Sequence, residues 1–458
     1  MLDAKRDQMR AKGVLYAQSP GARNHSRLFM AVSDPGAVDA LRFNRGYIAP
    51  EKQAVLRADV ARKLHEEVAL ARPEVLILSA HQLGNALSTH SEIARLRALL
   101  LPLSDDIEIV AHLDDPARML LRRYAVQLMD GRGRSPALEL GLLHAPSFWE
   151  AALATQPECD PQTGQFPDTQ GANFWLDFRR LQSEWEAVFG VGRVRFHSLD
   201  PARLYGEDAT GILRDSFGLS AIMGKAIPGA PPPAPSAAWT TRCRMLNEAI
   251  LRLLAHRNAI LPRQLWRKFL GEIKVHGDPI APGTLHALSA RFATDIATLC
   301  AQHPGLTPAR MAPDPARPDW SEADPTLGFR ATQYLMAFRW RINQATKAEL
   351  APKAGDLAQL ELGSTVAPSS TTLGPEALAG QPMPASAGPK LSPCAEQHLP
   401  PLAKQTFAKL AKSPFAPHNR MGQIDEEAPA PAFAPIVPRI LPEESSGNVL
   451  LGCMKNEA

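Results

Sequence analysis

Two short apolar runs, each followed by a turn and a helical segment, place the strongest constraint on how this 458-residue chain folds. Val75–Leu78 leads into a turn at His81, and Ile107–Leu113 leads into a turn at Asp114. Both runs are too short for helices and contain β-branched residues, so they predict buried strands. Because strands alternate with helices, we predict an α/β fold with a parallel sheet. Ligands bind at the carboxyl ends of such strands, so we expect a site near His81 and Asp114.

Charge and cysteine usage exclude several classes of protein. The net charge of +3 is too small to indicate binding to nucleic acid or to an anionic membrane. The five cysteines form no Cys-x-x-Cys pair, which predicts no metal site and suits a reducing cytoplasm. No apolar run reaches the roughly 18 residues of a transmembrane segment, and no secretory signal is present. We therefore expect a cytoplasmic location; no feature specifies an oligomeric state.

Periodicity and helix-ending residues predict the elements around the two strands. The segment Glu51–Leu70 repeats an apolar residue at every fourth position from Leu56 to Val68, which is typical of an amphipathic helix. Thr89 and Glu92 form the pattern of a capping box, and Asp115 precedes a proline as a helix N-cap. Further helices are predicted at Leu2–Lys12, Ile93–Leu101, Pro116–Met129 and Phe174–Phe189, and further strands at Val14–Tyr16 and Arg193–Leu199.

Several of these motifs resemble a bacterial sulfotransferase family with a P-loop fold, which is common in polysaccharide gene clusters. The shared patterns are a helix followed by Gly-Val-Leu-Tyr at 13–16, an Asn-His pair at 24–25, and a Trp-x-x-x-Phe-Gly motif at 185–190 that precedes a strand. The family's Ser-Ser-Glu, Arg-x-Pro, Ser and aromatic positions correspond here to 79–81, 114–116, Arg122 and Tyr124. The resemblance covers residues 2–219 and, more weakly, 241–348.

The resemblance implies a sheet of the P-loop nucleoside-kinase and sulfotransferase type that lacks its first strand. In the family, the helix and Gly-Val-Leu-Tyr motif directly follow the phosphate-binding loop, whereas this chain contains no such Gly-rich loop. That first strand is the central strand of the family's sheet. We therefore expect a truncated domain at 1–223 with an exposed strand edge and poor solubility.

The resemblance also implies a nucleotide site, with altered residues. Family members bind 3′-phosphoadenosine 5′-phosphosulfate, one phosphate of which lies at a helix amino end. Asp114 and Asp115 occupy that end here, so we expect no cofactor in this chain. Arg118 and Arg122 are either a rearranged phosphate clamp or charge partners of the aspartates, and we favour the second interpretation. His81 replaces the family's Glu, and is either a catalytic general base or a structural histidine.

The remaining chain divides by composition. Apolar periodicity predicts a helical subdomain at 239–350, with helices at Met245–Ala255, Leu265–Glu272, Leu285–Ala301 and Arg330–Leu350. Its aromatic residues Trp320, Phe329, Tyr334 and Trp340 are predicted to be core residues. Pro, Ala, Ser and Gly dominate 351–445, which predicts a disordered linker because so few apolar groups cannot offset chain entropy.

The end of the chain resembles the first strand of a family 2-type glycosyltransferase domain, beginning at 446. In that family the residues corresponding to Lys455, Asn456 and Glu457 lie beside the nucleotide, and an intact domain uses a nucleotide sugar and a divalent metal. The two resemblances predict a fragment of a fusion transferase of cell-surface polysaccharide synthesis, inactive in this form, with a saccharide or glycolipid acceptor. Two alternatives stay open: a non-catalytic interaction or scaffold module, and an active sulfotransferase that uses Arg122 and His81.

Overall fold

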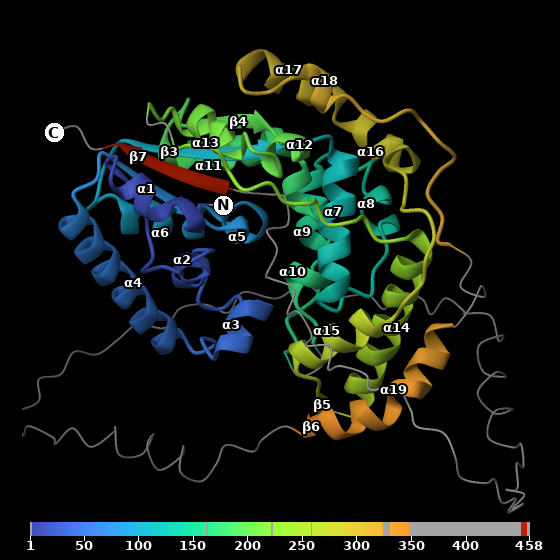
Figure 1. Ribbon diagram of the computed structural model, residues 1–458. Helices are drawn as coiled ribbons and strands as arrows, with labels where there is room; N and C mark the ends of the chain where they lie inside the picture. The colour runs from blue at the N-terminus through green and yellow to red at the C-terminus, as the bar shows by residue number, and fades with distance from the viewer. Residues whose placement is uncertain are drawn as a thin grey trace, which may run out of the picture. The chain divides into compact units, whose positions relative to one another are not determined.

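A computed structural model describes residues 2–161, 164–220, 223–257, 259–323, 330–348 and 450–455. The chain is an α/β protein in which helices surround a central five-stranded sheet (Figure 1). The predicted linker at 351–445 lies outside the described residues, as do Asn456, Glu457 and Phe329. No helix in the described ranges combines the length and the apolar character that crossing a bilayer requires.

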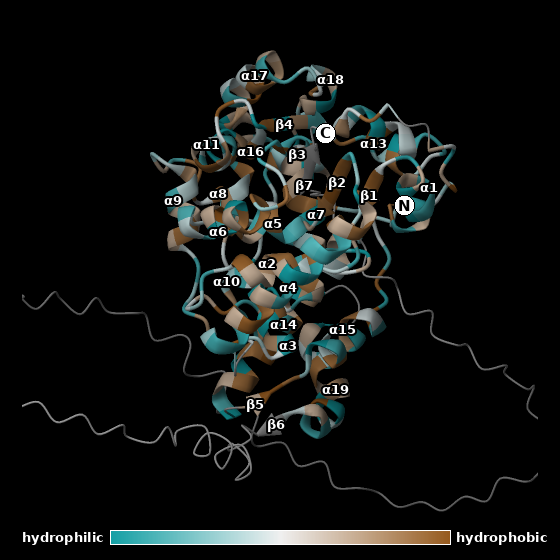
Figure 2. Ribbon diagram, turned by 90° about the vertical axis from the view of Figure 1, so that its left-hand side faces the viewer, coloured by the Kyte–Doolittle hydropathy of each residue, from teal (hydrophilic) through white to brown (hydrophobic). Residues whose placement is uncertain are grey.

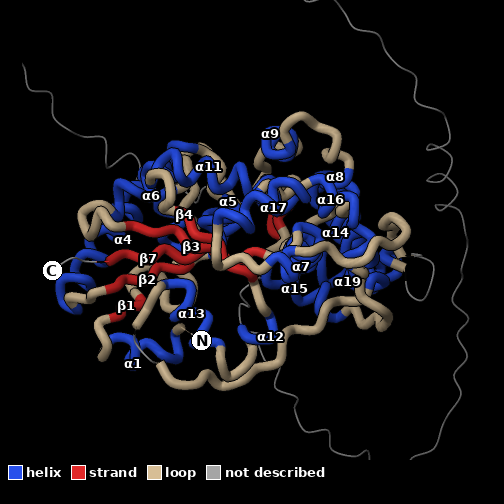
Figure 3. The backbone as a smooth tube through the Cα atoms, turned by 90° about the horizontal axis from the view of Figure 1, so that it is seen from above, coloured by secondary structure: helices blue, strands red, loops and turns tan. Residues whose placement is uncertain are grey.

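The sheet is mixed, because one strand runs against the others. Its strands are β1 (Val14–Tyr16), β2 (Val75–Ser79), β3 (Ile107–Leu113), β4 (Val194–Ser198) and β7 (Leu450–Lys455). They lie in the order β1-β2-β7-β3-β4 (Figure 3). The pairs β1–β2 and β3–β4 are parallel, and β7 is antiparallel to both of its neighbours.

The prediction of a parallel sheet is therefore confirmed for the pairs β1–β2 and β3–β4, but the central position that was expected to be open is filled by an antiparallel strand. The inner edges of β2 and β3 both pair with β7, which fills the place between the two parallel pairs. The physical reason is that each inner edge presents unpaired N–H and C=O groups that need a partner. The expected exposed edge is thus absent from this part of the described sheet.

The helices follow the predicted pattern with several breaks. In the first half they are α1 (Arg6–Arg10), α2 (Ser26–Val32), α3 (Ala40–Arg45), α4 (Pro50–Ala71), α5 (His81–Ala86), α6 (His90–Leu100), α7 (Pro116–Met129), α8 (Ala137–Leu140), α9 (Phe148–Ala154), α10 (Pro167–Gln170), α11 (Phe178–Phe189), α12 (Pro201–Leu204) and α13 (Ala209–Phe217). Beyond residue 230 they are α14 (Ala237–Arg257), α15 (Arg263–Glu272), α16 (His286–Arg291), α17 (Ala293–Gln302), α18 (Pro308–Met311) and α19 (Ala331–Ala345). The 3₁₀ turns η1 (Asp3–Lys5), η2 (Phe174–Leu176) and η3 (Pro282–Leu285) precede α1, α11 and α16, so three predicted helices are shorter than expected. A small antiparallel pair joins β5 (Ala259–Ile260) to β6 (Lys347–Ala348).

Local capping follows the sequence closely. The Thr89 side chain and the Glu92 side chain form a complete capping box at the start of α6. Glu92 also accepts the N–H of Asp34, at 2.9 Å, and so ties the loop after α2 to α6. The Asp115 carboxylate accepts the N–H groups of Ala117 and Arg118 at the start of α7. Both predicted caps are therefore confirmed.

Apolar side chains alternate between the two faces of the sheet. Leu76, Leu78 and Ile109 belong to the larger core, which α2, α4, α6 and α11 cover. Ile77 and Val110 point to the other face, into a smaller core with α1 and α13. This period-2 alternation is what a sheet covered on both faces requires. Brown, hydrophobic ribbon is correspondingly concentrated along the strands (Figure 2).

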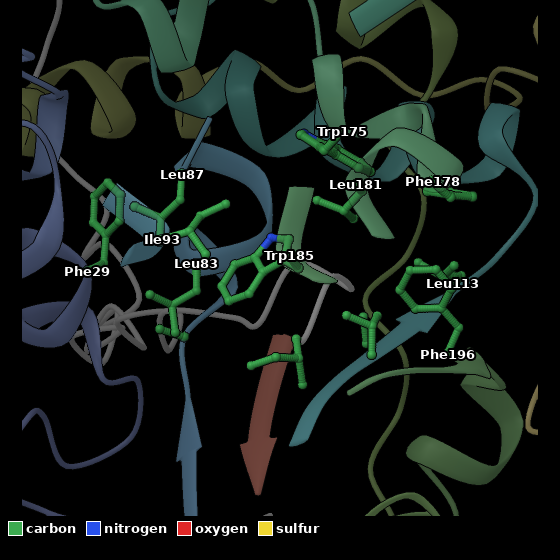
Figure 4. Close-up of a cluster of buried hydrophobic side chains, with 14 of the residues drawn as sticks. Phe29, Leu83, Leu87, Ile93, Leu113, Trp175, Phe178, Leu181, Trp185 and Phe196 are labelled. Carbon is green, nitrogen blue, oxygen red and sulfur yellow. The ribbon is translucent and has the colours of Figure 1, made fainter. Parts of the chain in front are cut away.

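Trp185 of α11 is central to the larger core. It is 1% exposed and stacks on Phe189 with 5.7 Å between ring centroids. Figure 4 shows it between two groups of side chains. One group is Phe29, Leu83, Leu87 and Ile93, and the other is Leu113, Trp175, Phe178, Leu181 and Phe196.

A further core joins α7 to the helices that follow residue 236. Asn247 of α14 accepts a hydrogen bond from the Trp266 indole, at 2.7 Å, and its amide donates to the carbonyls of Leu128 and Arg132. Gly131 adopts a φ of +93°, and a Cβ there would lie 3.2 Å from the Trp266 ring. Glycine is therefore needed both for the conformation and for the close approach.

The segments after residue 236 divide between two cores. Residues of α14, α15 and α19 form the core with α7, whereas Leu285, Leu288 and Leu299 of η3, α16 and α17 belong to the core of the sheet. Trp320 and Tyr334 are partly buried in these cores. Trp340 is 71% exposed, so its prediction as a core residue is wrong: it lies on the face of α19 that the described residues leave uncovered.

A fully buried ion pair connects the turn after α7 to α8. Arg132 and Glu139 are 2.8 Å apart and both side chains are 0% exposed. Gln127 accepts from Arg132 at 2.6 Å, and Asn173 donates to Glu139 at 2.8 Å. The neighbours thus supply the additional hydrogen bonds that a buried ion pair needs.

We predict that Glu139→Gln destabilises the protein by about 3–5 kcal/mol, because it leaves the Arg132 charge buried without a counter-charge. Denaturant unfolding monitored by circular dichroism measures the loss. Glu66→Gln is the matched control, because Glu66 pairs with Arg62 on the surface, where the side chains are 60% and 56% exposed. That control should cost less than about 1 kcal/mol, and an equal effect of both variants would contradict the prediction.

Candidate functional site

The residues predicted to form a site lie at one edge of the sheet. His81 and Asp114 follow the carboxyl ends of β2 and β3, as expected from the sequence. One strand, β7, separates β2 from β3, so the two strand ends are about 10 Å apart. At this edge β7 begins: Leu451 pairs with Ser79 and Leu450 pairs with Ala111.

The direction of β7 limits what this edge can bind. A phosphate loop requires a strand that ends at the edge and leads into a helix whose free N–H groups face the ligand. β7 instead brings its amino end to this edge. Lys455, from the glycosyltransferase-like motif, pairs with Val75 at the opposite edge of the sheet. The structure therefore does not bring Lys455 together with His81.

Asp114 holds both of the predicted clamp residues. Its Oδ1 accepts from Arg118 Nε at 2.8 Å, and its Oδ2 accepts from Arg122 Nη1 at 2.7 Å and from Arg122 Nη2. The Asp114 side chain is 5% exposed. Burial lowers the pKa of Arg122 to about 10, which leaves it positively charged at neutral pH. The two guanidinium groups thus neutralise a buried carboxylate.

Arg118 has further partners from a distant part of the chain. It pairs with Asp314 at 2.6 Å and donates to the carbonyls of Ala312, at 3.1 Å, and Arg310. These bonds fasten the segment after α18 to the first turn of α7. A phosphate bound by Arg118 would have to displace either Asp114 or this segment.

Asp115 adds a second carboxylate at the same helix end. Burial raises the pKa of Asp115, although the charge of Arg118 and the backbone N–H groups that Asp115 caps oppose the rise. An aspartate N-cap uses the donors that an anionic ligand would need. The start of α7 is therefore already occupied by the chain's own acidic groups.

His81 begins α5 and has a polar neighbour from the loop before α2. Its Nδ1 lies 3.4 Å from Asn24 Nδ2, and the Asn24 amide donates to Gln82 at 3.3 Å. Burial and the charge of Arg123 together lower the pKa of His81 to about 4. His81 is consequently neutral at pH 7. An imidazole with so low a pKa is a weak general base, since an effective one has a pKa near the working pH.

Arg123 is the arginine of α7 whose charge lowers the pKa of His81. Sequence analysis did not single it out. Adjacent helical residues point about 100° apart, so Arg123 faces away from Asp114 although it follows Arg122. Its Nη2 reaches the carbonyl of Asp168 at 3.4 Å, and its Nε is buried without a hydrogen-bond partner among the described residues. Arg122 and Arg123 are adjacent in sequence and of the same type. Their different partners follow only from the direction in which each points from α7 and from the segments packed against that helix.

His25 of the Asn-His motif has a structural role. It is 0% exposed, its Nδ1 accepts from the N–H of Ser79 at 2.9 Å, and its Nε2 lies 2.9 Å from the carbonyl of Ala17. These partners require the proton on Nε2. Burial lowers the pKa of His25 to about 4. The neutral ring therefore connects the ends of β1 and β2.

Two cavities lie away from these residues. One has a volume of about 360 Å³ and is lined by Glu207, Asp208, Thr210, Gly211, Arg214, Met223, Gly224 and Lys225. The other, of about 40 Å³, includes Asp130, Phe43, Phe166, Arg263 and Trp266 in its lining. Neither is lined by His81, Asp114, Arg118 or Arg122. Within the described ranges, no group of three or more His, Cys, Asp and Glu side chains is placed to hold a metal ion.

Comparison of the chain with protein-family models, with curated proteins and with solved structures finds no match.

We predict that Asp114→Asn destabilises the protein by about 1.5–3 kcal/mol, because it replaces charge-assisted hydrogen bonds to two guanidinium groups with weaker ones. Thermal and denaturant unfolding measure the change. Asp314→Asn is the control, since it removes one 37%-exposed partner of Arg118 and leaves Asp114 in place. Exposed pairs contribute about 0–1 kcal/mol. A larger loss in the control than in Asp114→Asn would contradict the central role of Asp114.

We predict a loss of stability as the pH falls from about 6.5 to about 4. Burial lowers the pKa values of His25, His81 and His112 to about 4, so in this window the unfolded chain binds protons that the folded chain does not. The stability that these neutral histidines contribute is fully present above about pH 6.5, and each histidine accounts for a loss of up to about 3 kcal/mol below it.

His81→Gln should reduce this pH dependence, measured by denaturant unfolding between pH 4 and pH 7. The exposed His65 of α4 supplies the control His65→Gln, which should retain it. An unchanged slope in His81→Gln would show that His81 is accessible to protons in the folded state.

Proposed function

We propose that this chain is a sulfotransferase-like module of a transferase that acts in cell-surface polysaccharide synthesis, and that the module itself has a scaffold or binding role and does not transfer sulfate. The family resemblance of residues 2–219 supplies the context. The charges at the sheet edge support the non-catalytic alternative.

The observation that carries this proposal is the enclosure of Asp114 by Arg118 and Arg122. A sulfate donor with two phosphate groups needs cations that are available to it. Here both cations are bound to a carboxylate that is itself buried, and Arg118 also holds Asp314. Replacing these contacts with a phosphate would leave Asp114 buried without a partner, which costs several kcal/mol.

Two further observations support the non-catalytic role. β7 runs antiparallel to β2 and β3, so no phosphate loop follows a strand at the position between them. The low pKa of His81 makes it a weak base at neutral pH. In the proposed role, the glycosyltransferase-like segment at Leu450–Lys455 acts as a strand of this sheet, and a saccharide or glycolipid acceptor belongs to the transferase as a whole.

A thermal-shift measurement with adenosine 3′,5′-bisphosphate tests the proposal on the full chain. We expect no saturable stabilisation, because the arginines that would bind the phosphates are occupied by Asp114. At about 1 mM ligand, a site with a dissociation constant of about 10 μM would add about 2.7 kcal/mol, which is easily detected.

Two variants make this result specific. Arg122→Ala should behave as the unmodified chain does toward the nucleotide. Asp114→Asn removes the negative charge that holds both guanidinium groups, so nucleotide binding by this variant alone would support the blocking role of Asp114. Saturable stabilisation of the unmodified chain that Arg122→Ala abolishes would overturn the proposal and favour an active sulfotransferase.

A further inference from the structure

Two carboxylates from distant segments meet at the start of α3. Asp39 is the N-cap of α3, and its Oδ1 accepts the N–H groups of Leu41, at 2.8 Å, and Arg42, at 2.9 Å. The N–H of Ala40 donates to the carboxylate of Asp168, from α10. Successive backbone N–H groups of one helix start therefore hold two acidic side chains side by side.

Each of these carboxylates has an oxygen that lacks a partner. Oδ2 of Asp39 and Oδ1 of Asp168 are buried, and neither accepts a hydrogen bond from any described residue. Buried polar atoms are nearly always paired. Two carboxylate oxygens cannot pair with each other while both groups are ionised, but a single proton converts one of them into a donor for the other.

The surrounding charges favour Asp168 as the ionised member. Burial raises the pKa of Asp168, and Asp130 adds to the rise, while Arg263 of α15 and Arg123 of α7 limit it. Burial and the charges of Asp168 and Asp39 raise the pKa of the nearby Cys159 thiol to about 11, so this thiol stays neutral. Asp39 has Arg42 as its nearby cation, and that guanidinium is bonded to the carbonyls of the loop before α3, such as Asp34 at 2.7 Å. Burial and the charge of Asp168 raise the pKa of Asp39 to about 7.

The two segments are also joined by apolar contacts. The rings of Phe43 and Phe166 are 5.6 Å apart, and Arg263 lies over the Phe166 ring at 5.6 Å. The carbonyl of Asp168 accepts from Gln127 of α7 at 3.0 Å. Asp168 thus links α3 to the helices around α7 and α15.

We propose that Asp39 and Asp168 share one proton as a carboxylic acid–carboxylate pair, and that this pair is a pH-sensitive latch between α3 and α10. Below neutral pH the Asp39 hydroxyl donates to Asp168 and both orphaned oxygens are satisfied. Above neutral pH the proton leaves, two negative charges face each other, and the contact weakens.

Equilibrium unfolding of the full chain at pH 6 and pH 8 tests this latch. The folded chain holds the proton on Asp39 at the lower end of this range, whereas the unfolded chain has already lost it, so the stability that this proton contributes falls as the pH rises. With a folded pKa of about 7, this proton alone should increase the unfolding constant about tenfold between pH 6 and pH 8. The buried histidines change the unfolding constant in the opposite direction near pH 6, so the tenfold factor is measured as the difference between the unmodified chain and a variant that lacks the proton.

Asp39→Asn is the decisive variant. Its Oδ1 still caps α3, and its amide N–H donates to Asp168 at every pH, so it imitates the protonated acid. We expect the tenfold change to disappear relative to the unmodified chain, and the variant to be the more stable of the two at pH 8. Asp168→Asn should remove the same pH dependence, because one proton serves both groups.

Asp200→Asn is the matched control. Asp200 is also a helix N-cap, at α12, but its carboxylate pairs with Arg310 at 2.9 Å. This variant should keep the pH dependence of the unmodified chain, and contributions from histidines cancel in each comparison. If Asp39→Asn and the unmodified chain change in parallel between pH 6 and pH 8, the shared proton is disproved.

Discussion

The antiparallel pairing of β7 is the constraint on which the rest of the structure depends. The parallel pairs β1–β2 and β3–β4 each present an inner edge of N–H and C=O groups, and β7 bonds to both edges. Without a strand in this place, the two halves of the sheet would not be one sheet. Because β7 enters from the edge where His81 and Asp114 lie, the pairing that completes the sheet also excludes a strand-to-helix phosphate loop there.

The charged side chains at that edge, Asp114, Arg118 and Arg122, stabilise one another. Asp114 is almost completely buried, and the two guanidinium groups that bind it offset the cost of removing its charge from water. Arg122 is partly buried, and the negative charge of Asp114 offsets the same cost for its guanidinium group. Arg118 extends this arrangement to Asp314, so the segment after α18 is held to α7 by the same group of charges. Residues that are needed to stabilise each other are poorly suited to binding a phosphate as well.

Local features of the fold could be predicted from the sequence because their causes are local. The stripe on α4, the capping box of Thr89 and Glu92, and the N-cap Asp115 each depend on residues within a few positions of one another. The pairing of Leu450–Lys455 with Val75–Ser79 could not be predicted in the same way. A strand's partner and direction depend on which edges remain unpaired after the rest of the chain has folded.

The candidate site was predicted in part, for the same reason. The carboxyl ends of β2 and β3 follow from the order of strands and helices, and the pairing of Arg118 and Arg122 with Asp114 follows from their spacing along one helix. The position of Arg123 depends on the segment that carries Asp168, which approaches α7 only in three dimensions. The exposed Trp340 was mistaken for a core residue because an apolar pattern does not show which face of a helix receives a partner.

Buried polar side chains in this protein are of two kinds. Some have all their polar atoms hydrogen-bonded, and others have an unpaired atom at which a proton can be gained or lost. Both ring nitrogens of His25 have backbone partners, and the side chain of Asn247 is bonded on both its oxygen and its nitrogen, so the fold accounts for these residues. In contrast, Asp39 Oδ2, Asp168 Oδ1 and Arg123 Nε are buried without partners, and Asp168 interacts with both of the others. One proton on Asp39 satisfies the two oxygens and leaves a single negative charge facing Arg123 and Arg263. The contact between α3 and α10 is therefore where a change in proton concentration near neutral pH acts, whereas the buried histidines respond at lower pH.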